Sequence, residues 1–140
     1  MSRRHRPFLD ANVLFSAAWS AGSRLRLLWE PRGTELLASA YVVEEARRNL
    51  ETEEARARLQ ALVERLRLVP EQRETLLPAG LDLRDKDRPV LAAALGAGAT
   101  HLVTGDRRDF GPFLGRTLAG ILVLTPADYL ALRRSRARRA

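Results

Sequence analysis

The sequence contains no cysteine and only two histidines, His5 and His101, among its 140 residues. Without cysteine the chain can form neither disulfide bonds nor thiolate zinc sites, and it has no cysteine nucleophile. Two histidines are too few for a metal site that is built from several imidazoles. A divalent metal would have to be held mainly by carboxylates, which favours a hard ion such as Mg²⁺ or Mn²⁺.

Long apolar runs are also missing, since none reaches the roughly 18 residues that a membrane-spanning helix needs. Near the N-terminus, arginines are followed by only a short apolar stretch before Asp10. A secretory signal needs a longer apolar segment behind its basic residues. We therefore expect a cytoplasmic protein with no membrane partner.

Positive charge is carried almost entirely by arginine, because Lys86 is the only lysine. The formal net charge is +7, and arginines contribute +3 within residues 3–6 and +5 within residues 133–139. Residues 8–132 are therefore near neutral, at about −1. Basic tails commonly contact nucleic-acid phosphates, although a tail that only aids solubility has the same composition. The tail residues that would make such phosphate contacts are Arg133, Arg134 and Arg136.

A chain of this length with 46% apolar residues is long enough for one domain with its own core. We expect that domain to span residues 1–140, with its core at about 8–130 and basic tails at 1–7 and 133–140. Short apolar runs typical of strands occur at 7–9, 35–39, 66–69, 101–104 and 121–124. Helical patterns occur at 12–19, 24–30, 41–50, 52–66, 90–98 and from Pro126 onward. This alternation predicts an α/β fold, a three-layer sandwich with a mainly parallel central sheet.

Two of the expected strands end in the same way, with apolar residues followed by an aspartate. Phe8-Leu9 leads into Asp10, and Leu102-Val103-Thr104 leads into Gly105-Asp106. The carboxyl ends of parallel strands share one edge of a sheet, and binding sites form beyond that edge. Other acidic residues lie near the starts of helices that follow strands, and they form two pairs, Glu44 with Glu45 and Asp85 with Asp87.

Carboxylates that share one cleft repel each other, and a divalent cation removes that repulsion. An oxygen-only site completed by water is what Mg²⁺ prefers, and such an ion assists phosphodiester hydrolysis by activating water. An aspartate before a helix or at a strand end can also be only a cap or a turn former. For any one of these acids alone, that structural role is the stronger interpretation.

Helical geometry distinguishes Glu45 from its neighbour Glu44. At about 100° per residue, the apolar side chains of residues 42, 43, 46 and 50 gather on one face of the expected helix. Glu45 lies nearer to the edge of that face than Glu44, which points more fully toward solvent. The pattern therefore favours Glu45 as the residue that faces a cleft at the end of the sheet.

Four segments together resemble the PIN-domain nucleases, and among them the PIN proteins that act as toxins of prokaryotic toxin–antitoxin pairs. The opening Asp-x-Asn motif is weak alone but becomes fairly specific together with the late Thr-x-Asp motif. The resemblance covers residues 8 to about 130. The segments that carry it are Phe8-Leu9-Asp10-Ala11-Asn12-Val13-Leu14, Tyr41-Val42-Val43-Glu44-Glu45-Ala46-Arg47-Arg48, Asp85-Lys86-Asp87-Arg88-Pro89-Val90-Leu91-Ala92 and Leu102-Val103-Thr104-Gly105-Asp106.

This resemblance implies a PIN-like fold and a ribonuclease that depends on Mg²⁺ or Mn²⁺. The residues that match the family's catalytic and metal-binding acids are Asp10, Glu45, Asp87 and Asp106. Asn12 matches an asparagine that orients Asp10 by hydrogen bonding, and Thr104 matches the hydroxyl residue beside the last acid. Possible accessory ligands are Glu44, Asp85 and Asp109.

The expected partners are RNA, an antitoxin protein and further copies of the chain, as a homodimer or higher oligomer. Two alternatives remain open: a non-catalytic RNA-binding or scaffold PIN domain, and a PIN nuclease of RNA processing without an antitoxin. Arg107 and Arg108, which follow Asp106, either clamp phosphate or lie in solvent. Asp109 is equally well interpreted as a helix cap. We expect His101 to be structural, and Trp19 and Trp29 to be core or dimer contacts rather than base-stacking platforms.

Overall fold

A six-stranded sheet forms the centre of the molecule, with strand order β3-β2-β1-β4-β6-β5. The computed structural model describes residues 4–30, 34–108 and 110–139. The strands are β1 (Pro7–Leu9), β2 (Leu37–Ser39), β3 (Arg67–Val69), β4 (His101–Val103), β5 (Thr117–Leu118) and β6 (Ile121–Leu124). All neighbouring strands pair in parallel except β5 and β6, which are antiparallel. The predicted mainly parallel sheet is therefore confirmed.

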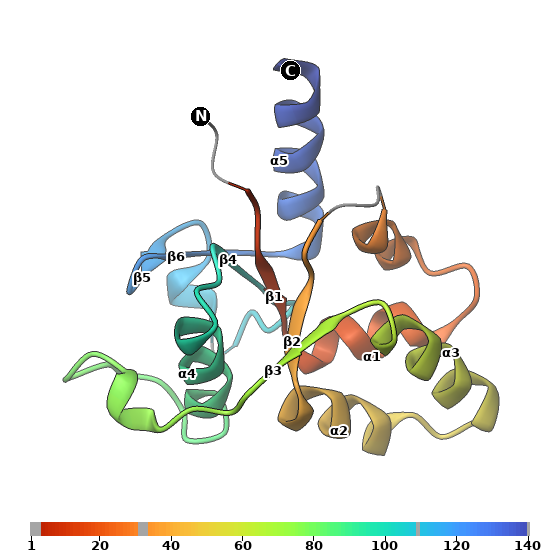
Figure 1. The fold of residues 1–140 in the computed structure, drawn as a ribbon, viewed down its shortest axis with the longest axis horizontal. Helices are drawn as coiled ribbons and strands as arrows, with labels where there is room; N and C mark the ends of the chain where they lie inside the picture. The colour runs from red at the N-terminus through yellow and green to blue at the C-terminus, as the bar shows by residue number, and fades with distance from the viewer. Residues whose placement is uncertain (1–3, 31–33, 109, 140) are drawn as a thin grey trace.

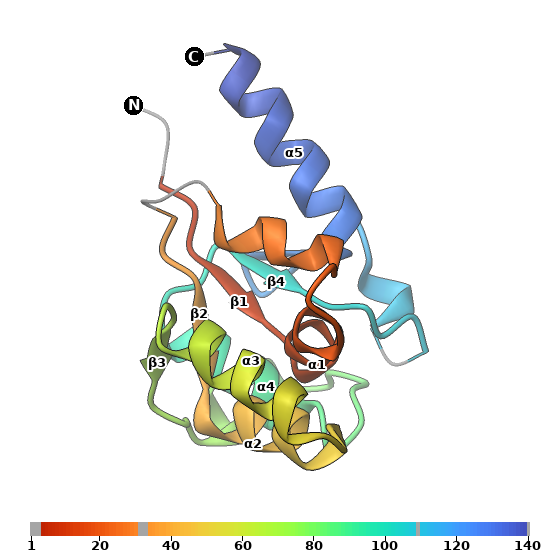
Figure 2. The ribbon, with the colours of Figure 1, turned by 90° about the vertical axis from the view of Figure 1, so that its right-hand side faces the viewer.

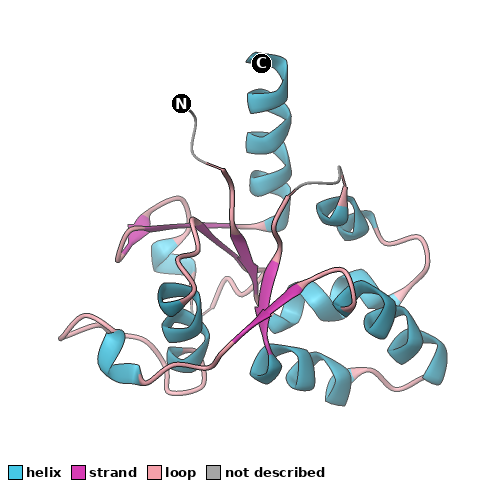
Figure 3. Cartoon of the chain, in the orientation of Figure 1, coloured by secondary structure: helices cyan, strands magenta, loops and turns pink. Residues whose placement is uncertain are grey.

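Helices cover both faces of this sheet, as expected for a three-layer sandwich. Figures 1 and 3 show α1 (Ala11–Trp19), α2 (Ala40–Asn49) and α3 (Glu53–Val63) on one side and α4 (Arg88–Gly96) on the other. The final helix is α5 (Pro126–Arg139), and three short 3₁₀ helices complete the fold: η1 (Arg24–Trp29), η2 (Glu74–Leu76) and η3 (Gly111–Phe113). Among the described residues, no helix is long and apolar enough to cross a membrane.

Short apolar strands form here because both of their faces are covered. All three residues of β1 and all three of β4 are buried, which is the burial expected for central strands of a parallel sheet. Side-chain caps then start the helices that follow. Ser39 accepts a hydrogen bond from Val42 N in α2, and Thr52 accepts one from Ala55 N in α3. Ser23 in the same way accepts a hydrogen bond from Leu25 N at the start of the 3₁₀ helix η1.

The antiparallel edge strand β5 is a strand that the sequence pattern did not predict. It is only two residues long, and a tight turn joins it to β6. Both central residues of this turn, Ala119 and Gly120, have positive φ, at 52° and 87°. Two consecutive left-handed residues match the twist of a hairpin, but alanine rarely adopts that conformation.

The two tryptophans have different environments. Trp29 is buried and donates a hydrogen bond from its indole N–H to Leu62 O at 3.0 Å, so its predicted core role is confirmed. Trp19 at the end of α1 exposes 58% of its surface, so a core role for it is wrong. The buried His101 packs against the rings of His5 and Tyr129, which agrees with the structural role expected for it.

Residues 4–6 and the later turns of α5 lie at the amino edge of the sheet. Tyr129 of α5 is fully buried, and its hydroxyl lies 3.2 Å from Nδ1 of His5, which precedes β1. Figures 1 and 2 show α5 leaving the end of β6 and extending past this edge. One arginine of the presumed tail belongs to the fold, because the Arg133 guanidinium donates to Leu27 O at 2.6 Å and to Leu28 O at 3.0 Å.

We predict that Arg133→Ala lowers the free energy of unfolding by about 1–3 kcal/mol, because two carbonyls of η1 lose a charged donor. Arg134, which is the next residue and is exposed, provides the matched control. Its replacement by alanine should change the free energy of unfolding by no more than about 0.5 kcal/mol. Urea unfolding measures both variants, and equal losses would contradict a specific role for Arg133.

Candidate functional site

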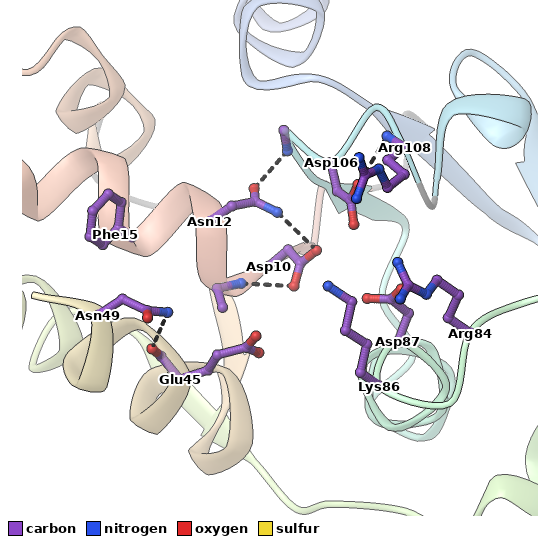
Figure 4. Close-up of a pocket in the computed structure, with 12 residues that line it drawn as sticks. Asp10, Asn12, Phe15, Glu45, Asn49, Arg84, Lys86, Asp87, Asp106 and Arg108 are labelled. Atoms are coloured by element: carbon purple, nitrogen blue, oxygen red, sulfur yellow. Dashed lines mark hydrogen bonds between the residues drawn. The ribbon is translucent and has the colours of Figure 1, made fainter.

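An open pocket of about 660 Å³ lies at the carboxyl edge of the sheet. The four predicted acids all line it, although they come from four different parts of the chain. Asp10 follows β1, Glu45 lies on α2, Asp87 precedes α4, and Asp106 follows β4. Figure 4 shows these side chains around one shared space.

Asp10 is buried within a hydrogen-bonded network at the centre of the site. One carboxylate oxygen, Oδ1, accepts from Ala11 N at 2.8 Å and so caps helix α1. The other, Oδ2, accepts from the Thr104 hydroxyl at 2.9 Å and from Asn12 Nδ2 at 3.3 Å. Strand register makes this network possible, since Asp10 N donates to Val103 O and thereby places Asp10 beside Thr104.

The same network connects Asp10 to the loop that carries Asp106. Asn12 Oδ1 accepts from Gly105 N at 2.7 Å, and Thr104 Oγ1 accepts from Asp106 N at 3.0 Å. A Cβ atom on Gly105 would lie 3.2 Å from Asn12 Oδ1, so the loop approaches the asparagine closely. Asn12 and Thr104 therefore lie in positions from which they can orient the Asp10 carboxylate, as the sequence analysis expects.

Burial raises the pKa of Asp10 from 3.8 to about 6. Hydrogen bonds from Ala11 and Thr104 oppose this rise because they stabilise the charged form. The negative charges of Glu45 and Asp106 add to it. The pocket thus holds a buried carboxylate whose ionisation at neutral pH is costly without a nearby cation.

Geometry separates each predicted acid from its neighbour in the sequence. Glu44 is exposed, and its carboxylate accepts from Arg47 Nε at 2.9 Å and from Arg47 Nη2 at 2.6 Å. The hydrogen bond from Arg47 lowers the pKa of Glu44, whose side chain points away from the pocket that Glu45 lines. Asp85 is exposed and outside the pocket lining, whereas Asp87 is buried and part of it.

The pocket also contains residues that the sequence analysis did not select. Two of them are cationic, Arg84 and Lys86, and they stand opposite α1 in Figure 4 together with Arg108. Arg108 belongs to a pair that was predicted, but its partner Arg107 is not part of the lining. Arg84 and Lys86 lie in the 82–87 loop, where they alternate with acids, so their local sequence gave no signal that they line the pocket. Asn49 and Phe15 complete the wall formed by α1 and α2.

Other predicted site residues lie elsewhere. Arg133, Arg134 and Arg136 are on α5, beyond the amino edge of the sheet, whereas the pocket is at the carboxyl edge. Asp109 lies outside the described residues.

Comparison with known families connects this geometry to a recognised group of proteins. The sequence profile of the PIN domain matches residues 6–108, which include all four acids of the pocket. The chain belongs to the PIN domain family. The predicted resemblance is thereby confirmed, and the family is one of nucleases. No curated protein matches the sequence closely enough to count as a relative.

Three of the solved structures that share this fold are of complexes bound to DNA. A chain of VapBC2 from Rickettsia felis, bound to a DNA fragment from its promoter, matches with a TM-score of 0.62 at 15% identity, over 86% of this chain and 98% of that chain. A chain of DNA-bound VapBC from Salmonella typhimurium matches with a TM-score of 0.60 at 18% identity, covering 87% and 98%. A chain of FitAB bound to the IR36 DNA fragment matches with a TM-score of 0.60 at 19% identity, covering 86% and 94%.

The donor set of this PIN domain suits a hard divalent ion. Its pocket offers carboxylate oxygens and no thiolate, and a cation there would offset the cost of ionising the buried Asp10. Across the described residues, no three histidine or acidic side chains lie close enough to form a ready-made metal site. Mg²⁺ commonly binds through one or two carboxylates and keeps several waters, so an open pocket with facing carboxylates fits it.

We predict that Asp10→Asn makes the metal-free PIN domain more stable at neutral pH. Because folding raises the pKa of Asp10, the folded state binds its proton more tightly than the unfolded state does. Ionised Asp10 therefore destabilises the folded state. This destabilisation is absent below about pH 3.8 and complete above about pH 6. In the presence of EDTA, asparagine should therefore add about 1–3 kcal/mol to the free energy of unfolding at about pH 7.5, and little at about pH 3.5.

Asparagine keeps an oxygen for the Ala11 cap, so the variant is expected to fold. Urea unfolding at the two pH values measures the effect, with the exposed Asp85→Asn as the matched control. A constant difference between Asp10→Asn and the parent protein at both pH values would show that ionisation of Asp10 does not limit stability.

Proposed function

We propose that this PIN domain is a Mg²⁺- or Mn²⁺-dependent endoribonuclease that acts in the cytoplasm as the toxin of a toxin–antitoxin pair. The observation that carries the proposal is the gathering of Asp10, Glu45, Asp87 and Asp106 around one open pocket, with Asp10 buried. Repelling carboxylates are retained together where a cation neutralises them. Hydrolysis of a phosphodiester bond is the reaction to which such a site is suited.

Carboxylates from this set of four would hold one or two ions, which would supply positive charge to the phosphoryl group and lower the pKa of the attacking water. Thr104 and Asn12 hold the Asp10 carboxylate in one orientation, so the side chain does not have to reorganise during the reaction. Tyr41 fixes the opposite loop, because its hydroxyl donates to Lys86 O at 3.0 Å.

Cationic residues around the pocket would bind the charged RNA backbone. Arg84, Lys86 and Arg108 line the wall opposite α1, which places positive charge beside the acids. The α5 arginines Arg134 and Arg136 are at the other edge of the sheet, so we assign them to distant phosphates of a long or folded RNA.

The antitoxin part of the proposal is supported by fold likeness to chains of VapBC and FitAB complexes. An antitoxin would act by occluding the acidic pocket or the RNA path beside it. We also retain the expectation of a homodimer or higher oligomer. A non-catalytic RNA-binding PIN domain would bind RNA with the same cations but would leave it uncut.

Cleavage of a labelled, structured RNA with and without Mn²⁺ tests the function. We predict cleavage that requires Mn²⁺ and is lost in Asp10→Asn. Glu45→Gln should reduce the cleavage rate by about 100-fold or more, which corresponds to an activation barrier higher by about 2.7 kcal/mol. Glu44→Gln, the adjacent control, should stay within about 5-fold of the parent protein because Glu44 pairs with Arg47 outside the pocket.

Binding of RNA without cleavage under any metal condition would contradict the nuclease proposal and favour the non-catalytic alternative. The reverse ranking of the two glutamine variants would contradict the assignment of Glu45.

A further inference from the structure

A second, shallow hollow adjoins the acidic pocket on its α1 side. It has a volume of about 240 Å³ and is lined by Phe15, Ser16 and Trp19. Phe15 lines both this hollow and the acidic pocket, so the two are neighbours along α1. A chain that leaves the acidic pocket over α1 therefore meets Phe15 first and Trp19 next.

The two aromatic side chains form a connected surface. Phe15 is half-buried and Trp19 is 58% exposed, and their ring centroids are 5.4 Å apart with planes tilted by 39°. They are four residues apart on α1, which places them on the same face of the helix. An indole this exposed at the end of a helix contributes little to the core. The other tryptophan, Trp29, is the one that packs in the core.

Positive charge lies beside this surface as well. The Arg58 guanidinium donates to Ala18 O and Trp19 O, both at 2.9 Å, so it is fixed at the end of α1. Arg26 donates to Ala21 O at 3.1 Å, just beyond that end. Aromatic platforms beside guanidinium groups are the combination that binds single-stranded nucleic acid, through base stacking and phosphate attraction.

The pocket thus has two unlike walls. Arg84, Lys86 and Arg108 form a cationic wall opposite α1, while Phe15 stands on the α1 side (Figure 4). The other exposed large apolar side chains each lie on a different element, so they do not extend Trp19 into a broad apolar face of α1. The four are Leu27, Leu68, Leu76 and Leu132. This narrow aromatic strip leads into the pocket. It is better suited to stacking with a nucleobase than to forming the broad apolar centre of a protein interface.

We propose that Phe15 and Trp19 form a nucleobase-stacking subsite for single-stranded RNA, next to the bond that the acidic pocket would cleave. This inference rests on the proposed ribonuclease function. It assigns bases to the α1 wall and phosphates to the cationic wall, and it makes Trp19 a binding residue rather than a catalytic one.

Indole fluorescence provides the test, because Trp19 is exposed and Trp29 is buried. A single-stranded RNA of about twelve nucleotides is titrated into the full-length Asp10→Asn protein, which leaves the RNA uncut. RNA should quench the emission, and the quenching should disappear in Asp10→Asn with Trp19→Leu. That second substitution should weaken RNA binding by about 5-fold or more, and Trp19→Phe should retain most of the affinity.

The salt dependence of binding separates stacking from charge. Trp19→Leu should leave the slope of log affinity against log salt unchanged, whereas Arg108→Ala should reduce it by about one. Leu76→Ser, which removes an exposed apolar side chain outside both hollows, is the matched control and should change neither quantity.

Unchanged affinity in Trp19→Leu would overturn the subsite. So would a Trp19→Leu variant that binds RNA normally but sediments as a monomer when the parent protein is a dimer, because Trp19 would then be a contact between copies. If the parent protein cleaves RNA and only the Trp19 results fail, the ribonuclease proposal stands and the subsite does not. If the parent protein neither binds nor cleaves RNA, both fail.

Discussion

The buried Asp10 carboxylate is held by hydrogen bonds at the junction of two parallel strands, and the site is built around it. The pairing of β1 with β4 sets Leu9 opposite Val103, so the residues that follow each strand come together. Thr104 and Asn12 then connect Asp10 to the loop that carries Asp106. A shift of this register by one residue would separate Asp10 from Thr104 and break the network, since alternate residues of a strand face opposite ways.

Burial gives this arrangement an electrostatic cost that a cation would offset. Loss of hydration and the neighbouring Glu45 and Asp106 both raise the pKa of Asp10. A neutral residue at position 10 would avoid this cost. The presence of a carboxylate there is therefore better explained by binding of a cation than by its capping of α1, which asparagine could also provide.

Local patterns in the sequence were sufficient for much of the fold and for the acids. The buried strands β1 and β4 are continuous apolar runs, and each is followed by an aspartate. Both could therefore be recognised from the local sequence alone. Helical spacing alone also favoured Glu45 over Glu44. The hairpin of β5 could not be found in this way, because its turn places Ala119 in a conformation that alanine rarely adopts.

What remained beyond sequence reasoning depends on contacts between distant segments. Nothing local distinguishes Arg133, which holds two carbonyls of η1, from the exposed Arg134 beside it. The exposure of Trp19 likewise depends on how α1 packs, since its sequence context is as apolar as that of a core residue. Lys86 lies between two acids in the chain, and only the fold shows that it shares the pocket with Asp10.

The most direct test of the central claim is calorimetric titration of Mn²⁺ into the protein at about pH 6, in two buffers of different ionisation enthalpy. The account predicts saturable binding that releases protons, because the ion displaces the proton from the partly protonated Asp10 carboxylate. It also predicts that Asp10→Asn loses most of this affinity while Glu44→Gln keeps it. Equal binding by all three proteins, or no binding by the parent protein, would contradict the assignment of these carboxylates as a metal site.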